Sequence, residues 1–145
     1  MEKLEVNYNM LDWWKKVMFK NYANFNGRAR RAEYWYYTLM NIIILLPLYL
    51  LGVAGMASES ELLGFLGIGS YVILALATFI PTLAVAVRRL HDTGKSGWFY
   101  LVGFIPLVGA IILLVWFFTD GNRFTNEYGE DPKNPQSLEL EFTGE

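Results

Sequence analysis

Leu62–Val87, which reads LLGFLGIGSYVILALATFIPTLAVAV, decides the fold, and it continues directly into Arg88–Trp98, RRLHDTGKSGW. The first of these stretches has 26 residues and no charged side chain. A helix needs roughly 20 apolar residues to cross a hydrocarbon layer about 30 Å thick. The stretch therefore predicts a membrane span, and the paired arginines at its end mark one surface of the membrane.

Two further uncharged stretches lie on either side of this one. Residues 34–56 and 98–118 are each long enough to cross a bilayer as a helix. Together the three stretches predict an all-α integral membrane protein with three transmembrane helices, over 34–56, 62–87 and 98–118. The start of the second span, 62–70, is rich in glycine, and an irregular or re-entrant entry there is an open alternative.

Residues 10–22, ahead of the first span, have the pattern of an amphipathic helix. At 100° per residue, apolar side chains gather on one face and charged ones on the other. The apolar face would contain Met10, Trp13, Trp14, Val17 and Met18, and the polar face Asp12, Lys15, Lys16 and Lys20. We expect this helix to lie in the headgroup region with its lysines toward anionic lipid. The alternative is that it packs on the protein's own cytoplasmic loops.

The chain thus divides into an amino-terminal segment 1–33, a membrane domain 34–118 and a tail 119–145. The tail is rich in turn formers, such as Asp120–Asn122 and Tyr128–Pro132. We expect Gln136–Glu145 to be disordered. Because residues 1–33 contain no continuous apolar segment, we also expect the first span to serve as an uncleaved anchor.

Lysine and arginine are distributed unevenly around the spans. Residues 1–33 hold seven of the twelve and residues 88–97 hold three, whereas the 57–61 connection holds none. Cytoplasmic loops carry the excess of basic residues in membrane proteins. Three crossings would therefore place the amino terminus and the 88–97 loop in the cytoplasm and the carboxyl terminus outside.

Composition excludes several kinds of site. The chain has no cysteine and a single histidine, so disulfides, thiolate nucleophiles and Cys- or His-rich metal sites are excluded. With a net charge of −2 we expect no nucleic-acid partner. Gly94-Lys95-Ser96 lacks the upstream glycine of a phosphate loop, because Arg89 stands there, and its neighbours are membrane spans. We therefore expect no cofactor.

Charged residues at the membrane surface suggest ion pairs. Glu33 stands where the first span begins, and an acid there is costly unless it is paired. We expect Glu33 to pair with Arg88 or Arg89, and Asp92 to pair with an arginine of the 28–31 cluster. The alternative is that these arginines set the topology and contact lipid phosphates. His91 and Asp92 can also be explained as parts of a tight turn.

Three segments resemble a known family. They are Phe25–Trp35, FNGRARRAEYW; Arg88–Trp98 with the following Ile105–Gly109, IPLVG; and Asn126–Pro132, NEYGEDP. The chain resembles the bacterial inner-membrane family known as domain of unknown function 805, over about Trp13 to Pro132. The resemblance implies an α-helical protein of the bacterial inner membrane, and it implies no reaction.

On these grounds we expect a non-enzymatic membrane protein that acts on lipids or protein partners through a cytoplasmic basic patch, with a homo-oligomer as one form of partner. The patch would comprise Arg28, Arg30, Arg31, Arg88, Arg89 and Lys95. One alternative is a subunit of an oligomeric transporter or channel whose path is lined by Asn41, Pro47, Thr78 and Thr82. A second is an enzyme acting on lipid, with His91 and Asp92 as its base.

Overall fold

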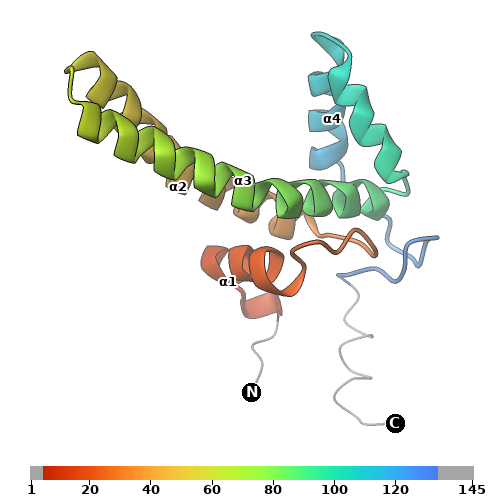
Figure 1. Ribbon diagram of the computed structural model, residues 1–145. Coiled ribbons are helices and arrows are strands. Elements are labelled where there is room, and N and C mark those ends of the chain that lie inside the picture. The colour runs from red at the N-terminus through yellow and green to blue at the C-terminus, as the bar shows by residue number, and fades with distance from the viewer. Residues whose placement is uncertain (1–4, 134–145) are drawn as a thin grey trace. The chain divides into compact units, whose positions relative to one another are not determined.

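The computed structural model describes residues 5–133, and the expected disorder of Gln136–Glu145 lies outside that part (Figure 1). Within it the fold is all-α: no strand is present, only an isolated bridge between Asn126 and Gly129. The helical segments, in chain order, are η1 (Glu5–Asn7), α1 (Met10–Lys15), η2 (Lys16–Lys20), α2 (Arg31–Ala57), α3 (Glu61–Asp92), η3 (Gly97–Phe104) and α4 (Val108–Phe118). Among these, η2 is a π-helical turn, whereas η1 and η3 are 3-10 helices.

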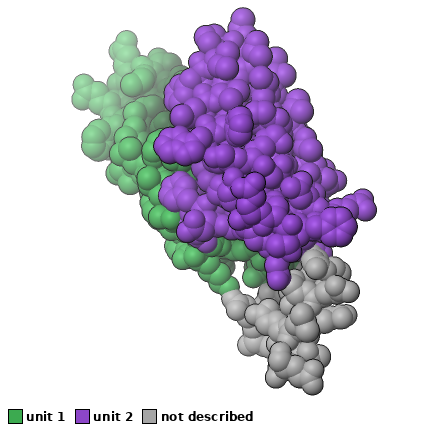
Figure 2. Space-filling model, turned by 90° about the vertical axis from the view of Figure 1, so that its right-hand side faces the viewer, with its two compact units in different colours: residues 1–23, 35–83 green, residues 24–34, 84–145 purple. Residues whose placement is uncertain are grey.

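These segments form two compact units, shown in different colours in Figure 2. Unit 1 comprises Met1–Ala23 and Trp35–Leu83, and unit 2 comprises Asn24–Tyr34 and Ala84–Glu145. These units group residues by packing, whereas the three consecutive segments expected from sequence divide the chain by its relation to the membrane and stay a prediction. Residues 24–33 and 119–133 each belong with the chain around the end of α3.

α2 and α3 have 27 and 32 residues, which correspond to about 40 and 48 Å of helix. Within the described residues they are the two helices long and apolar enough to cross a membrane. In each helix, only 17% of an apolar stretch of 18 residues is buried inside the protein. A core helix of a soluble protein would bury most of that surface. The exposed apolar side chains of both helices are therefore suited to lipid.

The prolines and glycines of α2 and α3 are accommodated within regular helix. Pro47 and Pro81 both lie inside their helices. The glycine-rich residues 62–70 are the first turns of α3, so the alternative of an irregular entry there is wrong.

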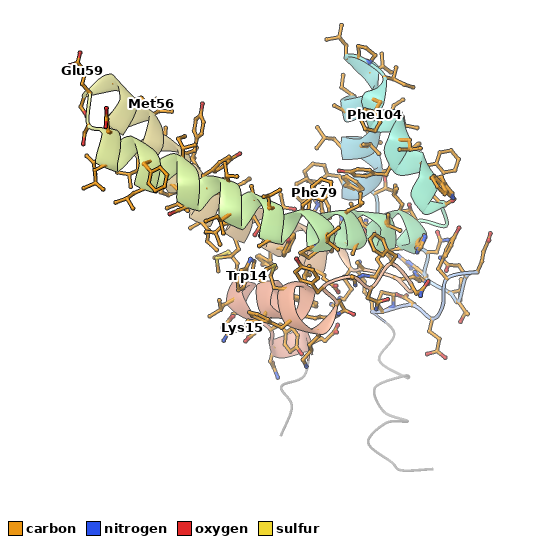
Figure 3. All side chains as sticks on the ribbon, viewed as in Figure 1. Trp14, Lys15, Met56, Glu59, Phe79 and Phe104 are labelled. Atoms are coloured by element: carbon orange, nitrogen blue, oxygen red, sulfur yellow. The ribbon has the colours of Figure 1, made fainter. Side chains whose placement is uncertain are left out.

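Glycines bring α2 and α3 together in unit 1, near the turn that joins them. A Cβ atom added at Gly55 would collide with the backbone of Gly64, and one at Gly67 would collide with the backbone of Gly52. Small residues allow such close approach between membrane helices. Figure 3 shows Met56 and Glu59 near the turn between α2 and α3. The sequence feature behind this contact is a pair of glycines three residues apart in each helix, Gly52 and Gly55 in α2 and Gly64 and Gly67 in α3. The motif typical of helix dimers has glycines four residues apart instead.

α1 and η2 turn their apolar face toward α2. Asn9 and Asp12 form a reciprocal capping box that starts α1. Trp13 and Val17 are only 2% and 0% exposed, and Trp14 Nε1 donates to Asn41 Oδ1 at 3.0 Å. In Figure 3, Trp14 lies on the side of α1 that faces α2, and Lys15 lies on the opposite side. Part of the apolar face is therefore buried within unit 1, whereas Leu11 and Phe19 are 43% and 73% exposed. The expected position of this helix in the headgroup region stays a prediction.

Residues 98–118 do not form one helix, so the expected single helical span over this stretch is wrong. η3 ends at Phe104, the chain turns, and α4 begins at Val108. Pro106 explains the break, because proline disfavours helical geometry at the residue before it, and Ile105 is extended with φ −75° and ψ 116°. Leu107 completes the turn at φ 64°.

The two limbs of this turn lie side by side (Figure 1). Gly109 sits so close to Val102 that an added Cβ would collide with the Val102 carbonyl oxygen. A Cβ at Gly103 would lie 2.8 Å from Leu113 Cδ1. We call residues 97–118 the apolar hairpin.

Candidate functional site

Six charged or titratable side chains gather in unit 2 around the end of α3. The loop before α2 runs beside this end of α3, where the Ala29 N–H donates to the Arg88 carbonyl at 3.0 Å. All six side chains belong to residues that are at most 9% exposed. We call them the ionic cluster: Arg28, Glu33, Arg88, Arg89, His91 and Asp92.

Glu33 pairs with Arg88. Arg88 Nη1 lies 2.5 Å from Glu33 Oε1, and both side chains are almost completely buried. Of Arg88 and Arg89, the two partners expected for Glu33, Arg88 forms the ion pair. The remaining Arg88 nitrogens, Nε and Nη2, are buried without a hydrogen-bond partner, so this guanidinium depends on Glu33.

Asp92 binds two arginines. Arg28 Nε donates to Asp92 Oδ1 at 3.0 Å, and Arg89 Nη1 donates to Asp92 Oδ2. Arg28 is the partner from the 28–31 cluster, whereas Arg89 comes from the preceding turn of α3 itself. Both carboxylate oxygens are thus engaged, in a pocket that also excludes a side chain at Gly121, where a Cβ would collide with the carboxylate.

The arginines also bind the end of α4. Arg89 Nε donates to the Phe117 carbonyl at 3.2 Å, Arg89 Nη2 donates to the Thr119 carbonyl, and Arg31 Nη1 donates to the Phe118 carbonyl at 3.2 Å. The last carbonyls of a helix have no partner within it and carry partial negative charge. Two arginines therefore cap α4.

Arg28 fixes the segment after α4 in the same way. Its Nη1 donates to the Phe124 carbonyl at 2.9 Å, and its Nη2 donates to the Asn122 carbonyl. The Asn122 N–H in turn donates to the Asp92 carbonyl at 2.8 Å. The described part of the turn-rich tail is therefore built into the ionic cluster, which the sequence did not predict.

His91 contacts the loop before α2 and the tail. Its Nδ1 lies 3.1 Å from the Gly27 carbonyl oxygen, and its ring stacks on Tyr128 with centroids 3.8 Å apart and planes 3° from parallel. Asn126 Nδ2 donates to the His91 carbonyl at 2.9 Å. A histidine base needs a hydrogen-bonded group that orients it toward a substrate. Here the oxygens of Asp92 are occupied by arginines, so this arrangement holds the tail in place.

Three of the six residues of the expected basic patch are engaged in these buried contacts. Arg28, Arg88 and Arg89 are 8%, 3% and 0% exposed, which leaves them no access to headgroups or a partner. Arg30, Arg31 and Lys95 are only half-buried. Lys95 Nζ lies 5.5 Å from the ring centroid of Trp116, over its face.

Arg31 belongs to an exposed group of charges with Asp120 and Lys133. Arg31 Nη2 and Lys133 Nζ lie 3.1 and 2.7 Å from Asp120 Oδ1. The hydrogen bond from Lys133, assisted by the charges of Lys133 and Arg31, lowers the pKa of the Asp120 carboxyl below its usual value. The Asp120 side chain is 62% exposed, so solvent weakens these pairs.

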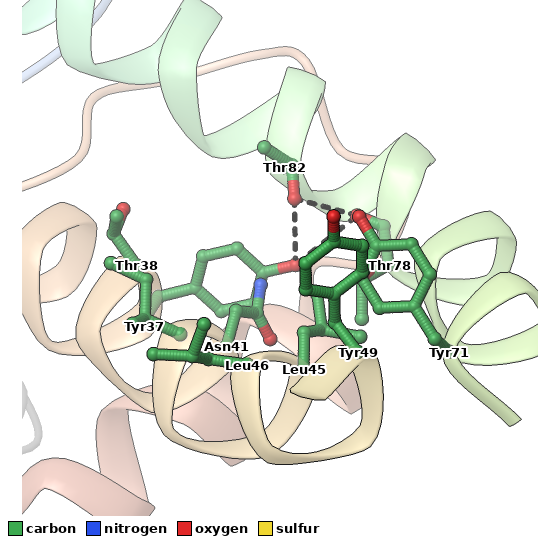
Figure 4. A pocket seen from close by; sticks show the side chains of 10 residues that line it. Tyr37, Thr38, Asn41, Leu45, Leu46, Tyr49, Tyr71, Thr78 and Thr82 are labelled. Atoms are coloured by element: carbon green, nitrogen blue, oxygen red, sulfur yellow. Dashed lines mark hydrogen bonds between the residues drawn. The ribbon is translucent and has the colours of Figure 1, made fainter. Parts of the chain in front are cut away.

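Unit 1 contains a groove between α2 and α3, with a volume of about 450 Å³ (Figure 4). Tyr37 Oη lies 3.1 Å from Thr82 Oγ1 and 3.3 Å from the Thr78 carbonyl oxygen. Of the residues expected to line a pathway, Asn41, Thr78 and Thr82 line this groove and Pro47 does not. The full lining is Tyr37, Thr38, Asn41, Ile42, Leu45, Leu46, Tyr49, Tyr71, Thr78 and Thr82.

Three tyrosines of this groove were missed by sequence reasoning. Tyr37, Tyr49 and Tyr71 were not among the residues expected to line a pathway, although the rings of Tyr49 and Tyr71 lie close together, with centroids 5.7 Å apart. Within residues 5–133 no group of three or more His, Cys, Asp or Glu side chains could hold a metal ion.

Known proteins match this chain over most of its length. Inner membrane protein YhaI of Escherichia coli (strain K12) is 43% identical over 123 residues, which are 85% of this chain and 97% of YhaI. Inner membrane protein YhaH of the same organism is 41% identical over 127 residues, 85% of this chain and 98% of YhaH. No solved structure matches. Residues 22–130 match the model of a family described as protein of unknown function, DUF805, and the chain therefore belongs to that family of inner-membrane proteins.

Proposed function

We propose that this protein is a non-enzymatic component of the bacterial inner membrane that works by binding lipids or other membrane proteins. The observation that carries the proposal is the engagement of Asp92 by Arg28 and Arg89. The residues best suited to chemistry, His91 included, are used to hold helix ends and the tail together. A catalytic base would instead be oriented toward a reacting group.

The orientation follows from charge. Ten of the twelve lysines and arginines lie in residues 1–33 and 88–97, and the ends of α2 and α3 that carry them meet through Glu33 and Arg88. Excess positive charge favours the cytoplasmic side. We therefore propose that the amino terminus and the ionic cluster are cytoplasmic, and that the turn between α2 and α3 is outside.

Contact with anionic headgroups would use the cations that keep access to solvent. Arg31 donates to the Phe118 carbonyl and pairs with exposed Asp120. Exposed ion pairs contribute roughly 0–1 kcal/mol, so a lipid phosphate can compete with Asp120 for Arg31. Lys95 lies beside Trp116, a combination common at membrane interfaces. We propose that Arg30, Arg31 and Lys95 bind lipid, and that the other three arginines of the expected basic patch do not.

Native mass spectrometry of the protein in mixed phosphatidylethanolamine and phosphatidylglycerol nanodiscs tests this role. In the double variant Arg31→Gln, Lys95→Gln, we expect the amount of bound phosphatidylglycerol to fall to about a third of the wild-type amount or lower. Lys15→Gln, which removes an exposed cation of unit 1, is the control. Equal phosphatidylglycerol retention by the wild type and the double variant would contradict the proposal.

The groove of unit 1 favours a second candidate, a subunit of an oligomeric transporter or channel. Hydroxyl groups of Tyr37 and Thr82 are polar positions along otherwise apolar helices, and they stand beside open volume. Such a subunit would assemble so that the groove faces a shared axis. Mass measurement in detergent, combined with crosslinking from a cysteine at Thr38 on the groove wall, tests it. A monomer without such crosslinks would eliminate this candidate.

A further inference from the structure

The apolar hairpin starts and ends beside the ionic cluster. Its first residue, Gly97, sits against α3, where an added Cβ would lie 2.6 Å from Val87 Cγ1. Its last turn is bound by Arg89 at the Phe117 carbonyl, and the Phe117 ring lies 4.5 Å from that of Tyr34. All these contacts lie within unit 2. The chain therefore leaves the carboxyl-terminal end of α3 and returns to it.

Neither limb of the hairpin is long enough to cross a bilayer. The 11 residues of α4 span about 17 Å, and the 8 residues of η3 span about 16 Å in 3-10 geometry. The hydrocarbon layer is about 30 Å thick. A hairpin of this length reaches roughly the middle of the membrane.

The surface of the hairpin matches hydrocarbon on every side. No charged residue occurs between Gly97 and Phe118. Phe104 and Leu107 beside the turn are 79% and 89% exposed, and Trp98 is also 79% exposed. Trp98 and Trp116 stand at the two ends away from the turn, where an interfacial anchor belongs. An apolar surface of this extent marks a membrane or protein contact.

Three backbone N–H groups at the turn are hydrogen-bonded within the apolar hairpin. Irregular backbone in hydrocarbon is costly unless its N–H groups are bonded. The N–H groups of Ile105, Val108 and Gly109 donate to the carbonyls of Val102, Pro106 and Ile105, at 2.9, 2.7 and 3.0 Å. Pro106 has no N–H to satisfy.

We propose that the apolar hairpin is a re-entrant element inserted into the acyl chains of the leaflet next to the ionic cluster. The chain then crosses the membrane twice, with α2 and α3, and residues 119–133 lie on the same side as the amino terminus. This replaces the external carboxyl terminus that three crossings would give. Only the name of that side, cytoplasmic, rests on the orientation proposed above.

Single-cysteine labelling tests the hairpin cleanly, because the chain has no cysteine. Three reporters suffice: Ala23→Cys for the amino-terminal side, Ser58→Cys for the α2–α3 turn and Thr125→Cys for the tail. Each is exposed and is treated with a membrane-impermeant maleimide in spheroplasts and in inverted membrane vesicles. We expect Thr125→Cys to label together with Ala23→Cys and opposite to Ser58→Cys. Labelling together with Ser58→Cys would overturn the proposal.

Cysteines at the turn test insertion itself. Leu107→Cys and Phe104→Cys should both resist the maleimide from either side, because the reactive thiolate does not form in hydrocarbon, and both should react once the protein is unfolded in sodium dodecyl sulfate. Rapid labelling by the impermeant reagent would place the turn in water and refute insertion. Efficient disulfide formation between two copies of Leu107→Cys would show that a second copy covers the turn, which also contradicts lipid contact.

These outcomes separate the hairpin from the orientation. If Thr125→Cys and Ala23→Cys label together but from the periplasmic face, the hairpin stands and the proposed orientation is wrong. Should a cysteine variant fail to accumulate, a fusion of green fluorescent protein after Lys133 gives the same information. Fluorescence is expected with the tail in the cytoplasm, whereas alkaline phosphatase activity from the matched fusion would contradict the proposed cytoplasmic tail.

Discussion

α2 and α3 are held together in two different ways along their length. Within unit 1 the contact depends on the absence of side chains, at Gly52, Gly55, Gly64 and Gly67. Within unit 2 it depends on buried charge, through Glu33 and Arg88. Close packing of glycines suits a region surrounded by hydrocarbon, where charge is expensive. Buried ion pairs suit the membrane surface, where arginines are needed to set orientation.

The two kinds of contact should differ in what breaks them. Removing one partner from a buried ion pair leaves the other charge uncompensated, which costs about 3–5 kcal/mol. Adding a side chain where two backbones meet costs about 1–3 kcal/mol, because the helices must separate. The glycine contact should be insensitive to changes in charge, whereas the ionic cluster should be sensitive to the loss of a single charge.

Asp92→Asn should have the largest effect, because it keeps the shape of the side chain and leaves Arg28 and Arg89 without a carboxylate. We expect the free energy of unfolding, measured by titration with sodium dodecyl sulfate in mixed micelles, to fall by about 3–5 kcal/mol. Asp120→Asn is the matched control, since its pairs are exposed. Equal losses in the two variants would contradict the structural role of the ionic cluster.

Gly55→Leu should have the next largest effect. Its side chain would meet the backbone of Gly64 and separate α2 from α3, which should lower the free energy of unfolding by about 1–3 kcal/mol in the same titration. Gly69→Leu adds the same side chain where no atom lies within 4 Å of the new Cβ. Similar losses for Gly55→Leu and Gly69→Leu would show that the glycines are not the contact.

Lys133→Gln should have the smallest effect. Because the pKa of Asp120 is lowered in the folded protein, this pair contributes stability above the unfolded carboxyl pKa of about 3.9. That contribution is lost as the pH falls through the folded pKa. We expect Lys133→Gln to raise the pKa of Asp120 in a carboxyl NMR titration, while stability at pH 7 changes by less than about 1 kcal/mol. An unchanged pKa would rule out the contact.

Sequence reasoning found the two spans because their signal is simple. The uncharged runs ending at Met56 and Val87 match α2 and α3 closely, and the cost of an acid at the membrane boundary pointed to a partner for Glu33. These inferences needed only length and charge. They did not depend on which other parts of the chain lie nearby.

The parts that sequence reasoning missed depend on tertiary neighbours. An apolar run of 21 residues looks the same whether it crosses once or folds back, and only Pro106 between Gly103 and Gly109 distinguished the two. The amphipathic pattern of residues 10–22 fits a lipid surface and a protein surface equally, so it did not predict the hydrogen bond from Trp14 to Asn41. Buried Arg28 donates hydrogen bonds to backbone carbonyls of residues 122–129. The sequence around Arg28 contains no pattern that predicts these distant partners.

The central claim is that the buried charged side chains of the ionic cluster hold the structure of this protein together, and a charge swap between Glu33 and Arg88 tests it most directly. Glu33→Arg and Arg88→Glu should each destabilise the protein by about 3–5 kcal/mol in the detergent titration. The double variant restores the pair with its charges exchanged, and we expect it to recover at least half of the loss. If the double variant is as unstable as the sum of the two single variants, the pairing does not hold the helix ends, and the account is wrong.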